Sequence, residues 1–255
     1  MPVSDKCGQG ASRATVQREF FAQKQEGRLT RVLTETEMLQ ITAATLAEYE
    51  QEAESFWRHT KEHDVSQNIA ALLRHIEGTH RFAILDLGCG PGRDLKTFTA
   101  LGHEAVGVEG ATRFVEMARA YSGCEVWQQD FLRLALPPAR FDGVFANASL
   151  FHVPRQELPR VLHELRRCLR PRGVLFASNP RGQNEEGWMG GRYGVWYEYA
   201  VWRALLTRVG FRELEHYYRP PGVPPAQQAW VASVWRKAAG SSEDLVPSST
   251  PSGAK

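Results

Sequence analysis

Three glycines at alternate positions, Gly88, Gly90 and Gly92, follow a short apolar run at residues 83–87. A carboxylate, Asp86, lies two residues before the first glycine. Glycines permit backbone angles that side chains disfavour, and they let a ligand approach the backbone N–H groups closely. The apolar run is typical of a strand buried on both faces, and a helical pattern follows the glycines. The stretch therefore predicts a strand, a ligand-binding turn and a helix; the alternative is an ordinary tight turn.

Residues 83–94, with the sequence AILDLGCGPGRD, resemble motif I of the class I S-adenosylmethionine (SAM) dependent methyltransferases. The resemblance implies that Asp86 lies by the amino group of the cofactor's methionine and that the glycine loop passes under the cofactor. A dinucleotide-binding loop is the rival interpretation, but its glycines follow the spacing G-x-G-x-x-G to seat a pyrophosphate. The spacing G-C-G-P-G-R and the upstream carboxylate favour SAM, which has no pyrophosphate.

Two further carboxylates follow predicted strands. Glu109 ends the strand at residues 105–108, where a carboxylate can accept hydrogen bonds from ribose hydroxyls. A dinucleotide fold has the same requirement, so Glu109 indicates only an adenosine-type ligand. Asp130 and Phe131 follow a third strand and suit adenine, the carboxylate accepting from the exocyclic amine. The alternatives are an exposed acid at a strand end and an aspartate that terminates a strand.

Helices ahead of the first strand usually cover the cofactor cleft in this family, so Tyr49 and Trp57 are added to the cofactor site, with core packing as the alternative. The expected cofactor-binding residues are Tyr49, Trp57, Asp86, Gly88, Cys89, Gly90, Gly92, Glu109, Gly110, Asp130, Phe131 and Asn147.

The acceptor side of the site is expected on two later segments. His152 lies on the loop after the fourth strand and is the candidate general base, although it could merely cap the next helix. Residues 178–197 combine glycines, aromatic residues and charges, and we interpret them as a substrate loop. Glu186, Arg192 and Tyr193 are its predicted acceptor-binding residues, and Tyr193 is also a catalytic candidate; a solvated surface loop is the alternative.

The elements that position these residues alternate between strand and helix, which predicts an α/β, doubly wound sheet. Its ligand crevice should lie at the carboxyl ends of the strands. The resemblance adds a C-terminal antiparallel hairpin strand. We therefore expect a mostly parallel seven-stranded sheet with helices on both faces and an N-terminal helical extension.

The expected organisation is one methyltransferase domain over residues 41–237, flanked by a loosely ordered extension at 1–40 and a disordered tail at 238–255. Residues 41–78 form the N-terminal cap helices of this domain, and residues 178–197 form its substrate loop.

Composition limits the possible partners. The 255 residues carry 31 Lys plus Arg against 29 Asp plus Glu, so no strong field for nucleic acid or an anionic membrane is present. Four widely spaced cysteines and no apolar signal segment indicate a reduced, cytoplasmic protein without a structural metal. We expect a monomer or weak dimer with no membrane partner.

The sequence therefore predicts an enzyme that transfers a methyl group from SAM to a nitrogen, sulfur or oxygen atom of a small molecule. The alternatives are an RNA or protein methyltransferase and a catalytically inactive SAM-binding regulatory protein. One departure is that Asn147 is followed by Ala-Ser-Leu rather than by Pro-Pro-Tyr or Pro-Pro-Phe. The missing motif weakens the case for methylation of a nucleobase amine or a protein glutamine.

Overall fold

A seven-stranded sheet forms the centre of the protein in the computed structural model, which describes residues 32–79 and 81–239. The strand order is β3-β2-β1-β4-β5-β9-β8. The strands are β1 (Ala83–Leu87), β2 (Glu104–Glu109), β3 (Glu125–Gln128), β4 (Phe141–Asn147), β5 (Leu169–Pro180), β8 (Phe211–Arg219) and β9 (Trp230–Lys237). Neighbouring strands from β3 through β5 are parallel, whereas β9 is antiparallel to both β5 and β8. The predicted fold class is confirmed.

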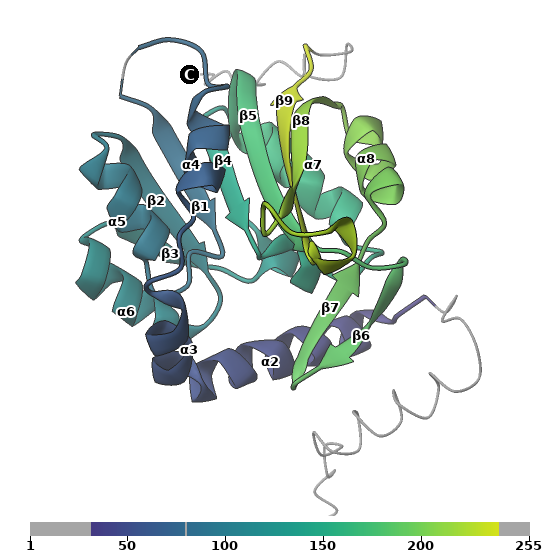
Figure 1. The fold of residues 1–255 in the computed structure, drawn as a ribbon. Helices are drawn as coiled ribbons and strands as arrows, with labels where there is room; N and C mark the ends of the chain where they lie inside the picture. Colours follow the sequence, from purple (N-terminus) through teal and green to yellow (C-terminus); the bar gives the residue numbers. More distant parts are fainter. Residues whose placement is uncertain (1–31, 80, 240–255) are drawn as a thin grey trace, which may run out of the picture.

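Helices cover both faces of the sheet (Figure 1). The helices α4 (Ser66–Leu73), α5 (Arg93–Ala100) and α6 (Thr112–Ser122) pack on one face, and α7 (Leu158–Cys168) and α8 (Tyr199–Arg208) pack on the other. Alternate residues of β1 show this directly, because Ile84 lies in the core that α4, α5 and α6 share, and Leu85 lies in the core that α7 and α8 share. All five residues of β1 are buried, as expected of a central parallel strand.

Two helices, α2 (Glu35–Gln51) and α3 (Ala53–Thr60), lie beyond the carboxyl ends of the parallel strands (Figure 1). The helix α2 begins at Glu35 rather than at Ile41, so the expected extension at 1–40 is wrong for its last residues. The reason is a capping box: the Thr34 N–H donates to Oε2 of Glu37 at 2.8 Å, and the Glu37 N–H donates to the Thr34 hydroxyl at 3.3 Å. Residues 1–31 and 240–255 lie outside the described residues.

Residues 178–197 are not the irregular loop that the sequence analysis expects. The strand β5 continues to Pro180, and β6 (Glu185–Met189) pairs with β7 (Arg192–Trp196) as a separate antiparallel hairpin. Its turn residues Gly190 and Gly191 both have positive φ, at 55° and 82°, as a tight two-residue hairpin turn requires. The hairpin packs against α2 (Figure 1), where the Tyr193 N–H donates to the Thr45 hydroxyl at 3.0 Å.

Candidate functional site

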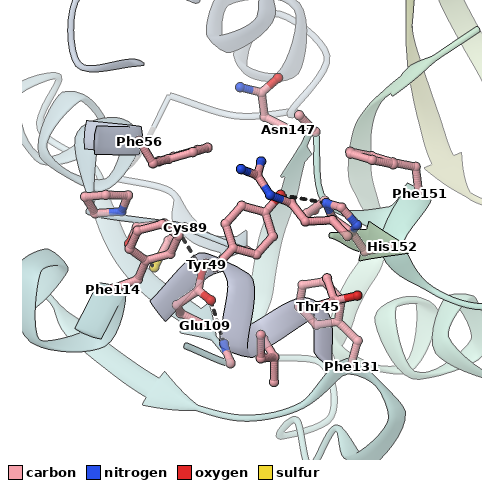
Figure 2. Close-up of a pocket in the computed structure, with 18 of the residues that line it drawn as sticks. Thr45, Tyr49, Phe56, Cys89, Glu109, Phe114, Phe131, Asn147, Phe151 and His152 are labelled. Carbon is pink, nitrogen blue, oxygen red and sulfur yellow. Dashed lines mark hydrogen bonds between the residues drawn. The ribbon is translucent and has the colours of Figure 1, made fainter. Parts of the chain in front are cut away.

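A cavity of about 460 Å³ lies at the carboxyl ends of β1, β2 and β4, between the glycine turn and the α2–α3 cap (Figure 2). Of the residues predicted to bind the cofactor, those that line it are Tyr49, Trp57, Gly88, Cys89, Gly90, Glu109, Gly110, Asp130, Phe131 and Asn147. Asp86, in β1, and Gly92, the last glycine of the turn, do not line the cavity. The predicted edge of the sheet is therefore the one that holds the cavity.

All three glycines of the turn have positive φ, but they differ in the space that a Cβ would meet. A Cβ on Gly88 would lie 2.6 Å from Cβ of Ser149, and a Cβ on Gly92 would lie 2.9 Å from the backbone of Ala118. At Gly90 the nearest atom would be a ring carbon of Phe56 at 3.8 Å. Packing thus requires two of the glycines, whereas the middle one leaves the backbone open to the cavity.

The Glu109 carboxylate ties the end of β2 to the glycine turn. It accepts hydrogen bonds from the N–H groups of Gly90 (2.9 Å), Gly110 (2.8 Å) and Ala111 (2.9 Å). Burial raises the pKa of Glu109, and the three hydrogen bonds oppose this shift. A carboxylate has about four lone-pair positions, so acceptor capacity remains for a ligand hydroxyl.

Just before the turn, Asp86 is only 2% exposed, and its Oδ2 has no hydrogen-bond partner within the described chain. Burial, and secondly the nearby Asp94, raise its pKa well above the usual range. Arg93 and Asp94, which the sequence analysis missed, line the cavity and form an ion pair with an Nε to Oδ1 distance of 2.7 Å. Their position directly after Gly92, in the first turn of α5, was the available signal.

Asp130 and Phe131 line the cavity where β3 gives way to a short 3₁₀ helix at Phe131–Arg133. Oδ1 of Asp130 accepts from the Leu132 N–H at 2.8 Å, so the carboxylate caps this turn. Within the described residues, no hydrogen bond engages its other oxygen, Oδ2, which is available to a ligand amine.

Asn147, at the end of β4, is fixed by a side-chain network. Its Oδ1 accepts from Nδ2 of Asn68 at 3.0 Å and from the Ser178 hydroxyl at 2.7 Å. Its Nδ2 donates to Oδ2 of Asp94 at 3.4 Å. These bonds join α4, β5 and α5 around one cavity-lining amide.

His152 and Tyr49 meet across the cavity (Figure 2). Nδ1 of His152 lies 2.6 Å from the Tyr193 carbonyl oxygen, which can only accept, so Nδ1 carries the hydrogen. Nε2 therefore accepts from the Tyr49 hydroxyl at 2.7 Å. Burial, opposed by the Tyr193 carbonyl and reinforced by the positive charge of Arg192, lowers the pKa of His152 to about 4. The imidazole is thus neutral at neutral pH.

The three acceptor-site candidates from residues 178–197 do not all face the cavity. Arg192 lines the cavity, with its guanidinium carbon 4.5 Å from the centre of the Tyr49 ring. The Tyr193 side chain is 1% exposed and packs edge-on against Trp188, away from the cavity. Glu186 also lies off the cavity and accepts from the Arg155 N–H at 3.2 Å. Because side chains alternate along β7, Arg192 and Tyr193 face opposite ways. Tyr193, predicted as an acceptor-binding and catalytic residue, contributes its backbone carbonyl to the site and not its side chain.

The sequence analysis also missed three aromatic residues of the cavity wall, which are Phe114, Phe151 and Trp230, and Phe56 lines the wall as well. Tyr49 contacts three ring neighbours, with centroid distances of 5.7 Å to Phe56, 5.6 Å to Phe114 and 5.5 Å to His152 (Figure 2). No local sequence signal joins the four aromatic residues of the wall, because each comes from a different element.

Within residues 32–79 and 81–239, no group of three or more His, Cys, Asp or Glu side chains could hold a metal ion. None of the helices described is long and apolar enough to cross a membrane.

Residues 84–173 match the sequence model of a family described as "Methyltransferase domain". A trans-aconitate 2-methyltransferase of Azoarcus sp. (strain BH72) is 36% identical over 104 residues, which cover 40% of this chain and 40% of that relative. A malonyl-[acyl-carrier protein] O-methyltransferase of Erwinia pyrifoliae is 29% identical over 117 residues, 45% of this chain and 44% of that relative. The chain spans less than half the length of these relatives.

Among solved structures, a Burkholderia thailandensis 1,6-didemethyltoxoflavin-N1-methyltransferase with bound 1,6-didemethyltoxoflavin and S-adenosylhomocysteine superposes with a TM-score of 0.68. It is 19% identical, and the superposition covers 83% of this chain and 94% of that one. The [4+2]-cyclase SpnF also matches, with a TM-score of 0.54, 17% identity and coverage of 71% and 85%. At these identities the likeness concerns the fold alone, which hosts more than one chemistry.

Proposed function

Because the chain contains a class I SAM-dependent methyltransferase domain, we propose that it is an enzyme that methylates a nitrogen, sulfur or oxygen atom of a small molecule. The observation that carries the proposal is a single cavity that places Glu109 and the glycine turn opposite the Tyr49–His152 pair and Arg192. One side of this cavity suits an adenosine ligand, and the other has polar groups for an acceptor.

The residues on the first side fit SAM. The backbone at Gly90 is open to the cavity, and Glu109 retains acceptor capacity for ribose hydroxyls. Asp130 and Phe131 would hold the adenine, while the Arg93–Asp94 pair offers both charges to the zwitterionic methionine end. Asp86 is buried just before the turn, and its Oδ2 has no hydrogen-bond partner among the described residues. We propose that it assists in binding the methionine end of the cofactor. When bound, the cofactor supplies an electrophilic methyl group on a sulfonium centre.

The chain's own contribution is alignment and exclusion of water. The cap helices and the β6–β7 hairpin enclose the acceptor side, and the aromatic wall keeps it apolar. His152 fixes the Tyr49 hydroxyl through its neutral Nε2. For an acceptor that carries a proton, we propose that Tyr49 and His152 form the route by which the proton leaves. A pKa of about 4 makes this imidazole a weak base, so an acceptor that needs little proton removal suits the site best.

A small acceptor is favoured over RNA or protein, since the cavity is covered by α2 and the hairpin and the net charge is only +2. A long polymer would have to pass beneath this cap, and a nucleic acid would lack a basic face.

Calorimetry with S-adenosylhomocysteine, followed by radiolabelled methyl transfer to a panel of amines, thiols, imidazoles and carboxylates, tests the proposal. The wild-type chain should bind S-adenosylhomocysteine but not NAD. Gly90→Val should abolish binding, since its side chain would enter the cavity, whereas Gly123→Val should not. Gly123 also has a positive φ (70°, against 50° at Gly90) but has open space around it, so it controls for backbone strain. Binding of NAD alone would refute the proposal. Transfer to RNA or protein only, or cofactor binding with no transfer, would establish one of the alternatives.

A further inference from the structure

Arg192, the first residue of β7, brings a positive charge to the cavity, and no carboxylate among the described residues pairs with it. Its Nε is buried and has no hydrogen-bond partner in the part of the chain that the structure describes. In the same part, no ion pair joins Arg192 to a carboxylate. Its guanidinium carbon lies 4.5 Å from the centre of the Tyr49 ring. A partly buried cation in such surroundings is costly unless a ligand supplies the counter-charge.

The other ionised groups of the cavity wall already have partners. Arg93 is paired with Asp94, with distances of 2.7 and 2.9 Å between their polar atoms. Glu109 accepts three backbone N–H groups, and Asp130 caps a turn. The acceptor side therefore has one uncompensated charge, and it is positive.

Aromatic side chains line the cavity on the side of Arg192. Phe151 lies against His152 with ring centres 3.9 Å apart, and Trp230 stands edge-on to Phe151 at 6.1 Å. Both aromatic residues line the cavity with Tyr49 (Figure 2 labels Tyr49, Phe151 and His152). Aromatic walls suit either a planar apolar molecule or a cation, but a cation would be repelled by Arg192.

We propose that the methyl acceptor carries a carboxylate, which Arg192 binds, on a planar apolar or aromatic body that the Tyr49, Phe151 and Trp230 side chains enclose. Guanidinium binds carboxylate through two parallel hydrogen bonds, which would also satisfy the Nε of Arg192. This inference rests on the proposed function and names the substrate class of the same cavity.

The test is calorimetry on the full chain saturated with S-adenosylhomocysteine, using probes of matched shape and different charge: benzoate and 2-naphthoate, their neutral amides, and benzylamine. The carboxylates should bind at least about tenfold more tightly than the amides, and the amine should bind most weakly. Arg192→Gln should remove the preference for carboxylate, and Arg192→Lys should restore part of it. Arg212→Gln, at an exposed position on β8, is the control and should bind as wild type does.

Equal binding of carboxylates and amides, tighter binding of benzylamine, or no carboxylate binding up to about 10 mM would overturn the inference while leaving the proposed function intact. A loss of S-adenosylhomocysteine affinity in Arg192→Gln, with the carboxylate preference retained, would assign Arg192 to the cofactor instead. Failure of the wild-type chain to bind S-adenosylhomocysteine would refute the proposed function itself.

Discussion

The two sides of the cavity are built differently. On the cofactor side, the turn at residues 88–92 and the end of β2 are joined through backbone N–H groups and one carboxylate, Glu109. The partners are near in sequence: Gly90 and Glu109 are 19 residues apart, and Gly110 and Ala111 directly follow Glu109. Strand pairing between β1 and β2 brings these segments together, so the geometry follows from the central sheet.

On the acceptor side, the contacts join elements that are distant in sequence. Tyr49 and His152 are 103 residues apart, His152 and Tyr193 are 41 apart, and Thr45 and Tyr193 are 148 apart. These contacts exist only when α2 and the β6–β7 hairpin are docked over the sheet. We infer that the fold of the sheet determines the cofactor side, whereas the docking of the cap determines the acceptor side.

The largest effect on the cofactor side is expected from Gly92→Ala, which should destabilise the fold that forms this side of the cavity. The residue has φ +90°, and a Cβ would lie 2.9 Å from the Ala118 backbone. Strain and overlap together should lower the free energy of unfolding by about 3 kcal/mol, measured by urea denaturation. Gly102→Ala, with φ +87° and no neighbour within 4 Å, should cost only about 1 kcal/mol. Equal losses in the two variants would contradict the packing role of Gly92.

The second prediction concerns the acceptor side and its dependence on pH. The pKa of His152 is about 4 in the folded chain, below its ordinary 6.5, because of burial and the positive charge of Arg192. Between these values the unfolded chain binds a proton that the folded chain does not, so stability falls as pH drops from 6.5 to 4. The loss attributable to His152 should reach up to about 3 kcal/mol.

The measurement is the free energy of unfolding at several pH values for wild type and His152→Asn. The wild-type curve should fall more steeply than the variant's between pH 6.5 and 4. His163→Asn, at an exposed position on α7, should keep the wild-type slope. Parallel curves for wild type and His152→Asn would show that the imidazole is not held neutral.

The same comparison explains what the sequence could predict. The glycine turn, Glu109, and the Asp130–Phe131 pair stand directly after strands, and β-strand periodicity is a local signal, so their common edge could be predicted. The Tyr49–His152 contact could not, because nothing local relates α2 to the loop after β4. The capping box at Thr34 and Glu37 and the Gly190-Gly191 turn were local signals for α2 and for the hairpin, and both were overlooked.

The orientation of Tyr193 was beyond sequence analysis for another reason. Alternation along residues 192–196 shows that neighbouring side chains face opposite sides, but without the hairpin it does not show which side faces the cavity. With it, Arg192 faces the cavity and Tyr193 faces the core.

A smaller effect is expected from Glu109→Gln, which tests whether the cofactor side binds through this carboxylate. The amide keeps one acceptor oxygen, which can still serve the Gly110 and Ala111 N–H groups. It places an NH2 group where the other oxygen accepts from Gly90, and it loses the charge and acceptor capacity that ribose hydroxyls would use. The dissociation constant for S-adenosylhomocysteine should rise about tenfold by calorimetry. Glu109→Ala is less informative, since three N–H groups would lose their acceptor and stability would fall as well. Glu104→Gln, exposed at the opposite end of β2, should leave affinity unchanged; a similar loss there would contradict a specific role of Glu109.

The smallest effect is expected from Tyr193→Phe, which distinguishes a residue that serves the site through its backbone from one that serves it through its side chain. The Tyr193 carbonyl holds His152, and its hydroxyl lies away from the cavity, so kcat/KM for the acceptor should change less than about twofold. Tyr49→Phe removes the hydroxyl that donates to Nε2 of His152 and should lower kcat/KM at least about tenfold, with S-adenosylhomocysteine affinity little changed. Both variants delete one phenolic oxygen and keep the ring. A difference in kcat/KM between them therefore reflects where the hydroxyl lies, not the type of group removed. A larger loss in Tyr193→Phe than in Tyr49→Phe would mean that the hairpin presents its other face to the acceptor, and the division between the two sides of the cavity would have to be redrawn.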